Sequence, residues 1–130
     1  MHEVPSRHFD IAIIGGGFAG VYCAQQVLKR TRGGRLRVGI IASENHMVFQ
    51  PMLPEVAGGS LSPHHVVNPI RTLCEAADVL KGEVTSLDME SRVLTLDGGK
   101  FTPNVTVTFD HLMLAPGAGV DVSRIPGMAT

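Results

Sequence analysis

A nearly continuous apolar run at residues 9–14 leads directly into a glycine-rich segment at residues 15–20. A short run of this kind, without alternation, is typical of a strand that is buried on both faces of a sheet. Apolar residues then recur at helical spacing up to Arg30, which predicts a helix that begins near Gly17 or Phe18. The sequence therefore predicts a strand, a tight turn and a helix in immediate succession.

The predicted helix has a clear end, and a second apolar run follows it. Lys29, Arg30 and Arg32 are cations suited to the last turn of a helix, and Gly33-Gly34 terminates it. Residues 36–42 read as a second strand. A helix that connects two strands makes a βαβ unit, so we expect these strands to be parallel with a right-handed crossover.

The middle of the chain predicts a binding loop and a short helix. Residues 43–63 are polar and interrupted by prolines and by Gly58-Gly59, as in a long loop retained for binding. Asn68-Pro69 then offers a helix N-cap followed by proline at the first helical position. Apolar residues at 70, 73, 74 and 77 supply one face of that helix.

The last third of the chain reads as strands. Residues 79–87, 93–96 and 105–109 predict an antiparallel meander with a hairpin turn at Asp97-Gly98-Gly99, and residues 111–115 predict a further buried strand. The predicted fold class is α/β, a Rossmann-like parallel sheet with a βαβ unit and an attached antiparallel β-meander. We expect residues 1–130 to form a single domain.

Composition excludes several classes of protein. The net charge is −1 and the eleven Lys and Arg are scattered, so nucleic acid is not an expected partner. Residues 1–10 are polar, and no run approaches the roughly 18 apolar residues that a membrane span needs, so a cytoplasmic location is expected. Cys23 and Cys74 are far apart in sequence. The spacing of His46, His64, His65 and His111 predicts no metal site.

The spacing Gly15-x-Gly17-x-x-Gly20 predicts a dinucleotide-binding turn, because it follows a buried strand and opens a helix. The first glycine permits the tight turn, the second lets the backbone approach a pyrophosphate, and the third lets helix and strand pack closely. Amides of Gly17, Phe18 and Ala19 would face the anion at the positive end of the helix dipole. A glycine-rich turn without a ligand is the less favoured interpretation.

The second strand lacks the acidic residue that commonly binds the ribose of NAD. Ile41 is followed by Ala42 and Ser43, and Glu44 comes two positions late. NAD is therefore a less secure ligand for this turn.

Four stretches of the chain carry a family resemblance. They are I-I-G-G-G-F-A-G at residues 13–20, F-Q-P-M-L-P-E-V-A-G-G-S-L at 49–61, N-P-I-R at 68–71 and G-E-V-T-S-L-D at 82–88. Together they resemble the N-terminal FAD-binding segment of type II NADH dehydrogenases, which are NADH:quinone oxidoreductases of the pyridine nucleotide-disulfide oxidoreductase superfamily. The resemblance spans nearly the whole chain and is most specific in the second stretch.

The resemblance implies FAD as the cofactor of this flavoprotein and assigns residues to its parts. It implies that the glycine turn holds the pyrophosphate, that the loop after the second strand lies at the adenosine ribose, and that the F-x-P segment approaches the flavin. The implied cofactor-binding residues are Gly15, Gly17, Phe18, Ala19, Gly20, Ala42, Ser43, Glu44, Pro51, Met52, Leu53, Val84, Ala115 and Gly117. Catalytic residues stay unassigned. Pro116 lacks the amide donor that an A-T-G-like turn would offer.

The resemblance also implies parts that 130 residues have no room for. Complete members have a second dinucleotide-binding domain for NADH, a segment that closes over the flavin, and a C-terminal region that holds the protein on the membrane. We therefore expect this chain to be a truncated FAD-binding domain that is inactive alone. The parent protein is expected to transfer electrons from NADH through FAD to a quinone. It is expected to lie peripherally on the cytoplasmic face of the membrane. The alternatives are a stand-alone FAD/ADP-binding module, a fragment of a sulfide:quinone oxidoreductase, and a remnant that self-associates through exposed surface.

Overall fold

The computed structural model describes residues 5–31, 35–100, 104–119 and 127. Its elements in chain order are β1 (Ser6–Ile14), α1 (Phe18–Arg30), β2 (Val38–Ala42), β3 (His46–Val48), η1 (Gln50–Met52), α2 (Leu53–Ala57), η2 (Pro63–His65), β4 (Val67–Pro69), α3 (Ile70–Leu73), β5 (Asp78–Lys81), β6 (Glu83–Asp88), β7 (Val93–Asp97) and β8 (Val105–Leu114). The predicted strand, turn and helix at the start of the chain are confirmed.

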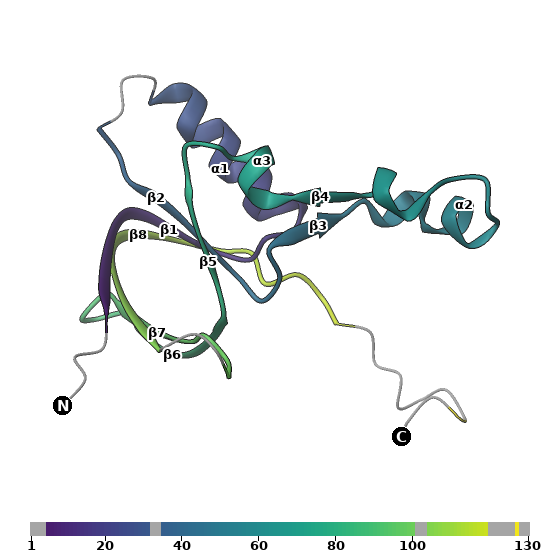
Figure 1. Cartoon of the computed structure of the whole chain (residues 1–130). Helices are drawn as coiled ribbons and strands as arrows, with labels where there is room; N and C mark the ends of the chain where they lie inside the picture. The colour runs from purple at the N-terminus through teal and green to yellow at the C-terminus, as the bar shows by residue number, and fades with distance from the viewer. Residues whose placement is uncertain (1–4, 32–34, 101–103, 120–126, 128–130) are drawn as a thin grey trace.

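A six-stranded sheet forms the body of the protein, with strand order β5-β2-β1-β8-β7-β6 (Figure 1). β5, β2, β1 and β8 are parallel, whereas β7 pairs antiparallel with both β8 and β6. The predicted Rossmann-like parallel sheet with its βαβ unit and attached antiparallel meander is thus confirmed. β7 and β8 pair antiparallel as far as Leu96 and Val105, and Gly99 donates its amide to Asp97 Oδ1 at 2.7 Å, but the connection between these strands is longer than the predicted turn at residues 97–99 and includes residues outside the described ones.

The central strands are buried on both faces. Ile40 of β2 packs in a cluster with Val21 and Ala24 of α1 and Ile70 of α3. The next residue, Ile41, packs in a second cluster on the opposite face with side chains of β1, β7 and β8. Because successive side chains of a strand point to opposite faces, burial on both faces requires the unbroken apolar run that the sequence shows.

The predicted strand at residues 79–87 is in fact two strands, β5 and β6, at opposite edges of the sheet. The chain passes from one edge to the other at Gly82, and the sheet curls around its second core (Figure 1). A Cβ atom at Gly82 would lie 2.6 Å from the carbonyl oxygen of Asp97, and the Gly82 amide donates to Ala42 O at 3.0 Å. Gly82, between Lys81 and Glu83, marks the break, which the reading of residues 79–87 as one strand passed over.

The two strands predicted at residues 105–109 and 111–115 are one continuous strand, β8. Asp110 does not interrupt it, because β8 pairs with β1 from Thr106 to Leu114 while its pairing with β7 covers only the first part. The prediction that its second half is buried is wrong. Leu114 is 56% exposed, since the described pairing of this half is with β1 alone.

The predicted binding loop has secondary structure of its own. β3 and β4 form a two-stranded antiparallel sheet that carries η1, α2 and η2 at its far end; we call residues 46–69 the β3–β4 arm (Figure 1). Asn68 is not the predicted N-cap, because it pairs with Met47 in this sheet. Pro69 takes the N-cap position, and α3 is a single turn.

The end of α1 agrees with the prediction. Thr31 takes the C-cap position, and its amide and hydroxyl both donate to the carbonyl oxygen of Val27, at 2.9 and 2.8 Å. The predicted terminating glycines at 33 and 34 lie outside the described residues.

Leu94 and Leu87 are opposite one another in the β6–β7 pair and provide a matched test of the second core. Leu94 is fully buried and Leu87 is 36% exposed. We expect Leu94→Ala to lower the free energy of unfolding by about 2–5 kcal/mol, because it leaves a cavity in the core. Leu87→Ala should cost clearly less in urea denaturation. Equal losses would contradict the described packing.

Candidate functional site

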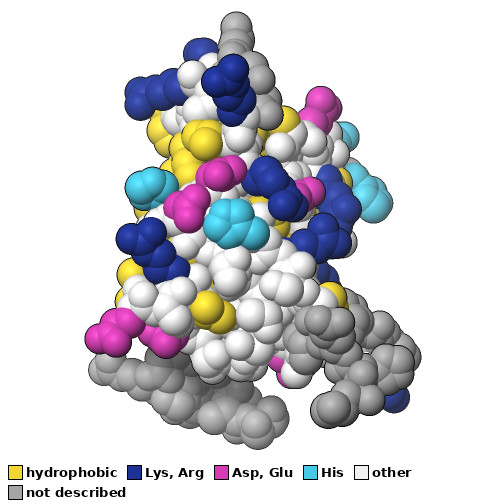
Figure 2. All heavy atoms as spheres, turned by 90° about the vertical axis from the view of Figure 1, so that its left-hand side faces the viewer, with side chains coloured by type: hydrophobic (Ala, Val, Ile, Leu, Met, Phe, Trp, Pro, Cys, Tyr) yellow, Lys and Arg dark blue, Asp and Glu magenta, His cyan; other side chains and the backbone are white. Residues whose placement is uncertain are grey.

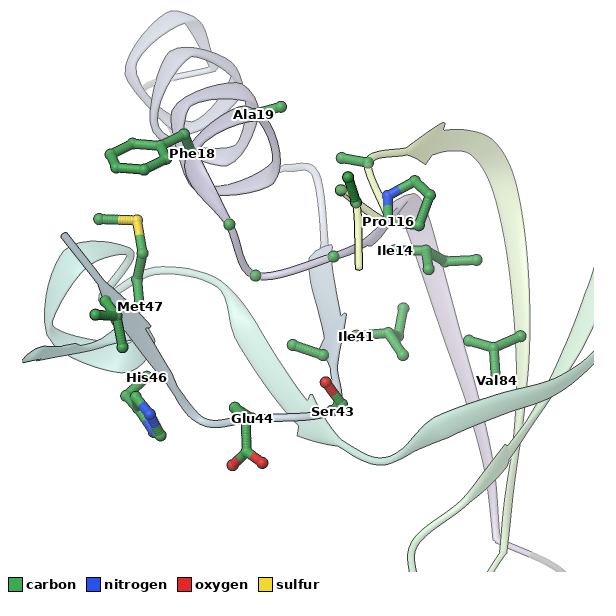
Figure 3. A pocket seen from close by; sticks show the side chains of 18 of the residues that line it. Ile14, Phe18, Ala19, Ile41, Ser43, Glu44, His46, Met47, Val84 and Pro116 are labelled. Carbon is green, nitrogen blue, oxygen red and sulfur yellow. The ribbon is translucent and has the colours of Figure 1, made fainter. Parts of the chain in front are cut away.

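A cleft of about 830 Å³ lies where β1 and β2 end at their carboxyl side. Its lining comes from residues 14–19, 41–44, 46–48, 50, 82–84 and 115–118. The carboxyl end of a parallel sheet is where open α/β folds bind their ligands. Figure 3 shows the cleft with the glycine turn at its centre, between Phe18 and Met47 on one side and Ile41 and Val84 on the other.

Two glycines of the turn are required by contacts within the protein. Gly15 has a φ of +115°, and a Cβ atom there would lie 1.9 Å from the carbonyl oxygen of Ala115. A Cβ at Gly20 would lie 1.9 Å from the carbonyl oxygen of Gly15. Gly20 is buried and does not line the cleft. These positions close the turn and bring α1 against β1, as their spacing predicts.

Gly17 differs, because no atom of the described chain lies within 4 Å of a Cβ built there. It is the N-cap of α1, and its extended backbone, with φ −83°, is open to any residue. Packing inside the protein therefore gives no reason for glycine at this position. Glycine is among the residues favoured at an N-cap, and here it also leaves room for close approach of an external group to the backbone.

The N-terminus of α1 has the character of an anion site. Within the described residues, no side chain caps it, and its first turn carries no acidic residue. The first amides of a helix lack partners inside the helix and carry partial positive charge. Phe18 and Ala19 line the cleft beside Gly17, so the first turn of α1 borders the cleft.

Polar side chains gather where β2 ends. Ala42, Ser43 and Glu44 line the cleft there, and Glu44 Oε2 lies 3.4 Å from Lys81 Nζ at the end of β5. The two side chains are 61% and 58% exposed, so this ion pair contributes little to stability. Figure 3 shows the Glu44 side chain pointing away from the glycine turn.

The side of the cleft away from the arm is lined by residues 115–118 and by Val84. Ala115 lines the cleft, but its amide already donates to Ile14 O at 2.8 Å, and Pro116 has no amide hydrogen. Gly117 follows with a φ of +73°. Val84 approaches from β6, the strand that begins just after Gly82.

The residues of the arm that line the cleft lie near its base. Met47 points toward Phe18 in Figure 3, and the Phe18 and Phe49 rings meet edge to face with centroids 5.8 Å apart. Gln50 lines the cleft. The predicted contacts at 51–53 lie further out, in η1 and the start of α2, and do not line it.

The structure brings most of the predicted cofactor residues together. Those that line the cleft are Gly15, Gly17, Phe18, Ala19, Ala42, Ser43, Glu44, Val84, Ala115 and Gly117; those that do not are Gly20, Pro51, Met52 and Leu53. His46, Met47 and Glu83 were missed by the sequence analysis. Glu83 lies in the G-E-V stretch and could have been found, whereas the arm residues needed the β3–β4 pairing.

The cysteines lie apart from the cleft lining. Cys74 is buried, and its thiol donates to the carbonyl oxygen of Val21 at 3.7 Å. Burial raises the pKa of the Cys74 thiol, which disfavours the reactive thiolate. Cys23 is partly buried on α1.

Among the described residues, no helix is both long and apolar enough to cross a bilayer.

A family model described as pyridine nucleotide-disulphide oxidoreductase matches residues 9–130. The chain belongs to this family. Its glycine turn, parallel sheet and meander are therefore those of a pyridine nucleotide-disulphide oxidoreductase.

Relatives of known function are longer than this chain. It is 33% identical over 121 residues to the type II NADH:quinone oxidoreductase of Mycobacterium tuberculosis, covering 88% of this chain and 24% of that protein. It is 27% identical to the mitochondrial external alternative NAD(P)H-ubiquinone oxidoreductase B3 of Arabidopsis thaliana, covering 97% of this chain and 23% of that protein. The chain thus spans about a quarter of these relatives.

A solved structure has the same fold. NDH2 from Plasmodium falciparum, determined in complex with NADH, superposes with a TM-score of 0.74 at 25% identity. The match covers 93% of this chain and 25% of that one.

Gly17→Ala and Gly20→Ala test the division of roles in the turn. We expect Gly20→Ala to lower the free energy of unfolding by about 1–3 kcal/mol or more, because its Cβ would overlap Gly15 O. Gly17→Ala should unfold within about 0.5 kcal/mol of the wild type, because the space there is open. Urea denaturation measures both, and a large loss for Gly17→Ala would contradict this assignment.

Iodoacetamide labelling at pH 8 tests the burial of Cys74. We expect Cys74 to react at least about tenfold more slowly than Cys23 in the folded protein, because it is buried and its thiolate is disfavoured. In urea the two rates should converge. Equal rates in the native protein, read by mass spectrometry of peptides, would show that Cys74 is accessible.

Proposed function

We propose that this chain is the FAD-binding portion of a flavoprotein NADH dehydrogenase that passes electrons from NADH through FAD to a quinone. The observation that carries the proposal is the uncapped N-terminus of α1, which opens into the cleft beside a glycine that no contact in the described chain requires. Membership of the family and the names of its relatives support the choice of reaction.

In this proposal, FAD would lie along the cleft, with each part of the cofactor against a different group of lining residues. The amides of Gly17, Phe18 and Ala19 would hold the pyrophosphate, where the dipole of α1 favours negative charge. Ala42, Ser43 and Glu44 would lie at the adenosine ribose. Because Ala42 has no hydrogen-bonding side chain, Ser43 and Glu44 supply the polar groups at that end.

Backbone groups would complete the site. Val84 would contact the adenine with its main chain, and Ala115 and Gly117 would lie beside the cofactor. The Ala115 amide is held by Ile14, so Gly117 is the better placed donor on this wall. The tip residues Pro51, Met52 and Leu53 would approach the flavin ring from the arm.

FAD would supply the electron-transfer chemistry, and the residues of this chain would bind and orient it. The chain's contribution is the placing of amides and the shape of the cleft, since no side chain here is assigned a catalytic role. NADH and quinone are proposed as substrates of the whole protein. The relatives that act on such substrates are about four times as long as this chain.

NADH:quinone oxidoreduction is preferred to the sulfide:quinone reaction. Neither cysteine of this chain is placed as a redox-active thiol, because Cys74 is buried and hydrogen-bonded and Cys23 packs against the core on α1. The two relatives named above act on NAD(P)H or NADH and on a quinone, according to their names.

Retention of FAD tests the proposal directly. The chain is mixed with FAD and passed through a gel-filtration column, and the protein peak is examined for visible flavin absorption. We expect the wild type to retain FAD and Gly17→Ala to bind it at least about tenfold more weakly, because the added methyl occupies the space of the pyrophosphate.

Gly119→Ala is the matched control. Its position is also open within 4 Å in the described chain, and it lies outside the cleft lining, so FAD retention should equal that of the wild type. A folded wild type that retains no FAD, or a Gly17→Ala variant that binds as well as Gly119→Ala, would overturn the proposal.

A further inference from the structure

We propose that His8, Asp10 and Asp110 form a binding site for one divalent transition-metal ion of the zinc type. The site lies on the exposed face of the β1–β8 pair, away from the lining of the nucleotide cleft. Figure 2 shows histidine and acidic side chains next to one another on one face of the molecule.

The pairing of β1 with β8 brings these residues together across about 100 positions of sequence. His8 is opposite Thr108, and Asp10 and Asp110 lie between the pairs Phe9–Phe109 and Ile11–His111. Residues two apart on a strand share a face. His8 and Asp10 therefore stand on the same face as Asp110.

The distances suit a single ion. One ligand atom from each residue lies within 4.8 Å of the other two, and His8 Nε2 is already 3.6 Å from Asp110 Oδ2. Zinc bonds to nitrogen and oxygen are about 2.0–2.2 Å long, which puts tetrahedral ligand atoms about 3.4 Å apart. His8 and Asp110 are half exposed, so small side-chain rotations close the set.

The hydrogen bonds of Thr108 orient the imidazole. Thr108 Oγ1 faces the carbonyl oxygen of Arg7 at 3.5 Å, and a carbonyl can only accept. The hydroxyl therefore offers its lone pair to His8 Nδ1 at 2.9 Å, and Nδ1 carries the proton. In the neutral ring, Nε2 then presents its lone pair toward Asp110. Metal-binding histidines characteristically donate their other ring N–H to such a partner.

The local charges favour a cation. Asp10 and Asp110 are like charges on adjacent strands, an arrangement that is destabilising without compensation. Asp10 Oδ2 accepts the backbone amide of Arg37 at 2.5 Å, but the guanidinium of Arg37 pairs with Asp78 at 3.6 Å. A bound cation would compensate these two charges, and direct binding measurements test for it.

The ligand types select the ion. One imidazole with two carboxylates suits zinc and neighbouring transition metals, whereas calcium and magnesium prefer sites made of oxygen alone. With three protein ligands on an exposed face, a fourth position stays open to water. The site joins β1 to β8 directly, so a bound ion would stabilise the folded chain by mass action.

Isothermal titration of the chain with zinc chloride at pH 7.5, with calcium chloride in parallel, tests the proposal. We expect one zinc ion per chain, no comparable binding of calcium, and a higher midpoint of thermal unfolding with zinc. His8→Ala and Asp110→Asn should each weaken zinc binding at least about tenfold. His64→Ala, which removes an exposed histidine of η2, should bind as the wild type does.

Thr108→Val separates a metal site from a simple ion pair. It keeps all three ligands and removes the partner of Nδ1, so zinc binding should weaken about tenfold, as loss of such outer partners does. Circular dichroism checks that each variant folds. Zinc binding that is absent, or that survives His8→Ala unchanged, or that is lost with His64→Ala, overturns the proposal. FAD retention should be unchanged in every variant.

Discussion

The close contact of three backbone segments at the end of β1 is the constraint on which the rest of the structure depends. Gly15 lies against the carbonyl oxygen of Ala115, and Gly20 lies against the carbonyl oxygen of Gly15, so that β1, β8 and α1 meet without side chains between them. This contact sets the direction in which α1 leaves the sheet. The open amides of Gly17 and its neighbours then face the cleft and not the core.

Burial of the central strands on two faces completes this arrangement. α1 and α3 cover one face, and the curl of the sheet at Gly82 encloses the other, so that side chains of β1 and β2 support the turn from both sides. Every residue of β2 is buried, and the polar Ser43 and Glu44 lie just beyond its end. The cleft is consequently a site of backbone amides and a few polar side chains at the rim, which suits a large cofactor bound along its length.

Features that depend on local sequence were predicted, and features that depend on distant contacts were not. The βαβ unit follows from a buried run, a glycine turn and a helical period within 34 residues of one another. By contrast, the sequence alone predicts a helix cap at Asn68, whereas Asn68 pairs with Met47 in a sheet. It also predicts a break between strands at Asp110, whereas pairing with β1 continues on both sides of Asp110. His8 and Asp110 are 102 positions apart, so spacing could not predict their proximity.

The central claim is that the amides at the start of α1 hold the pyrophosphate of FAD. The most direct measurement is a two-dimensional ¹⁵N–¹H spectrum of the chain titrated with FAD, with riboflavin, which has no phosphate, as the comparison. We expect the amide signals of Gly17, Phe18 and Ala19 to shift most with FAD and to remain in place with riboflavin. Shifts confined to other parts of the chain, or equal shifts with riboflavin, would contradict it.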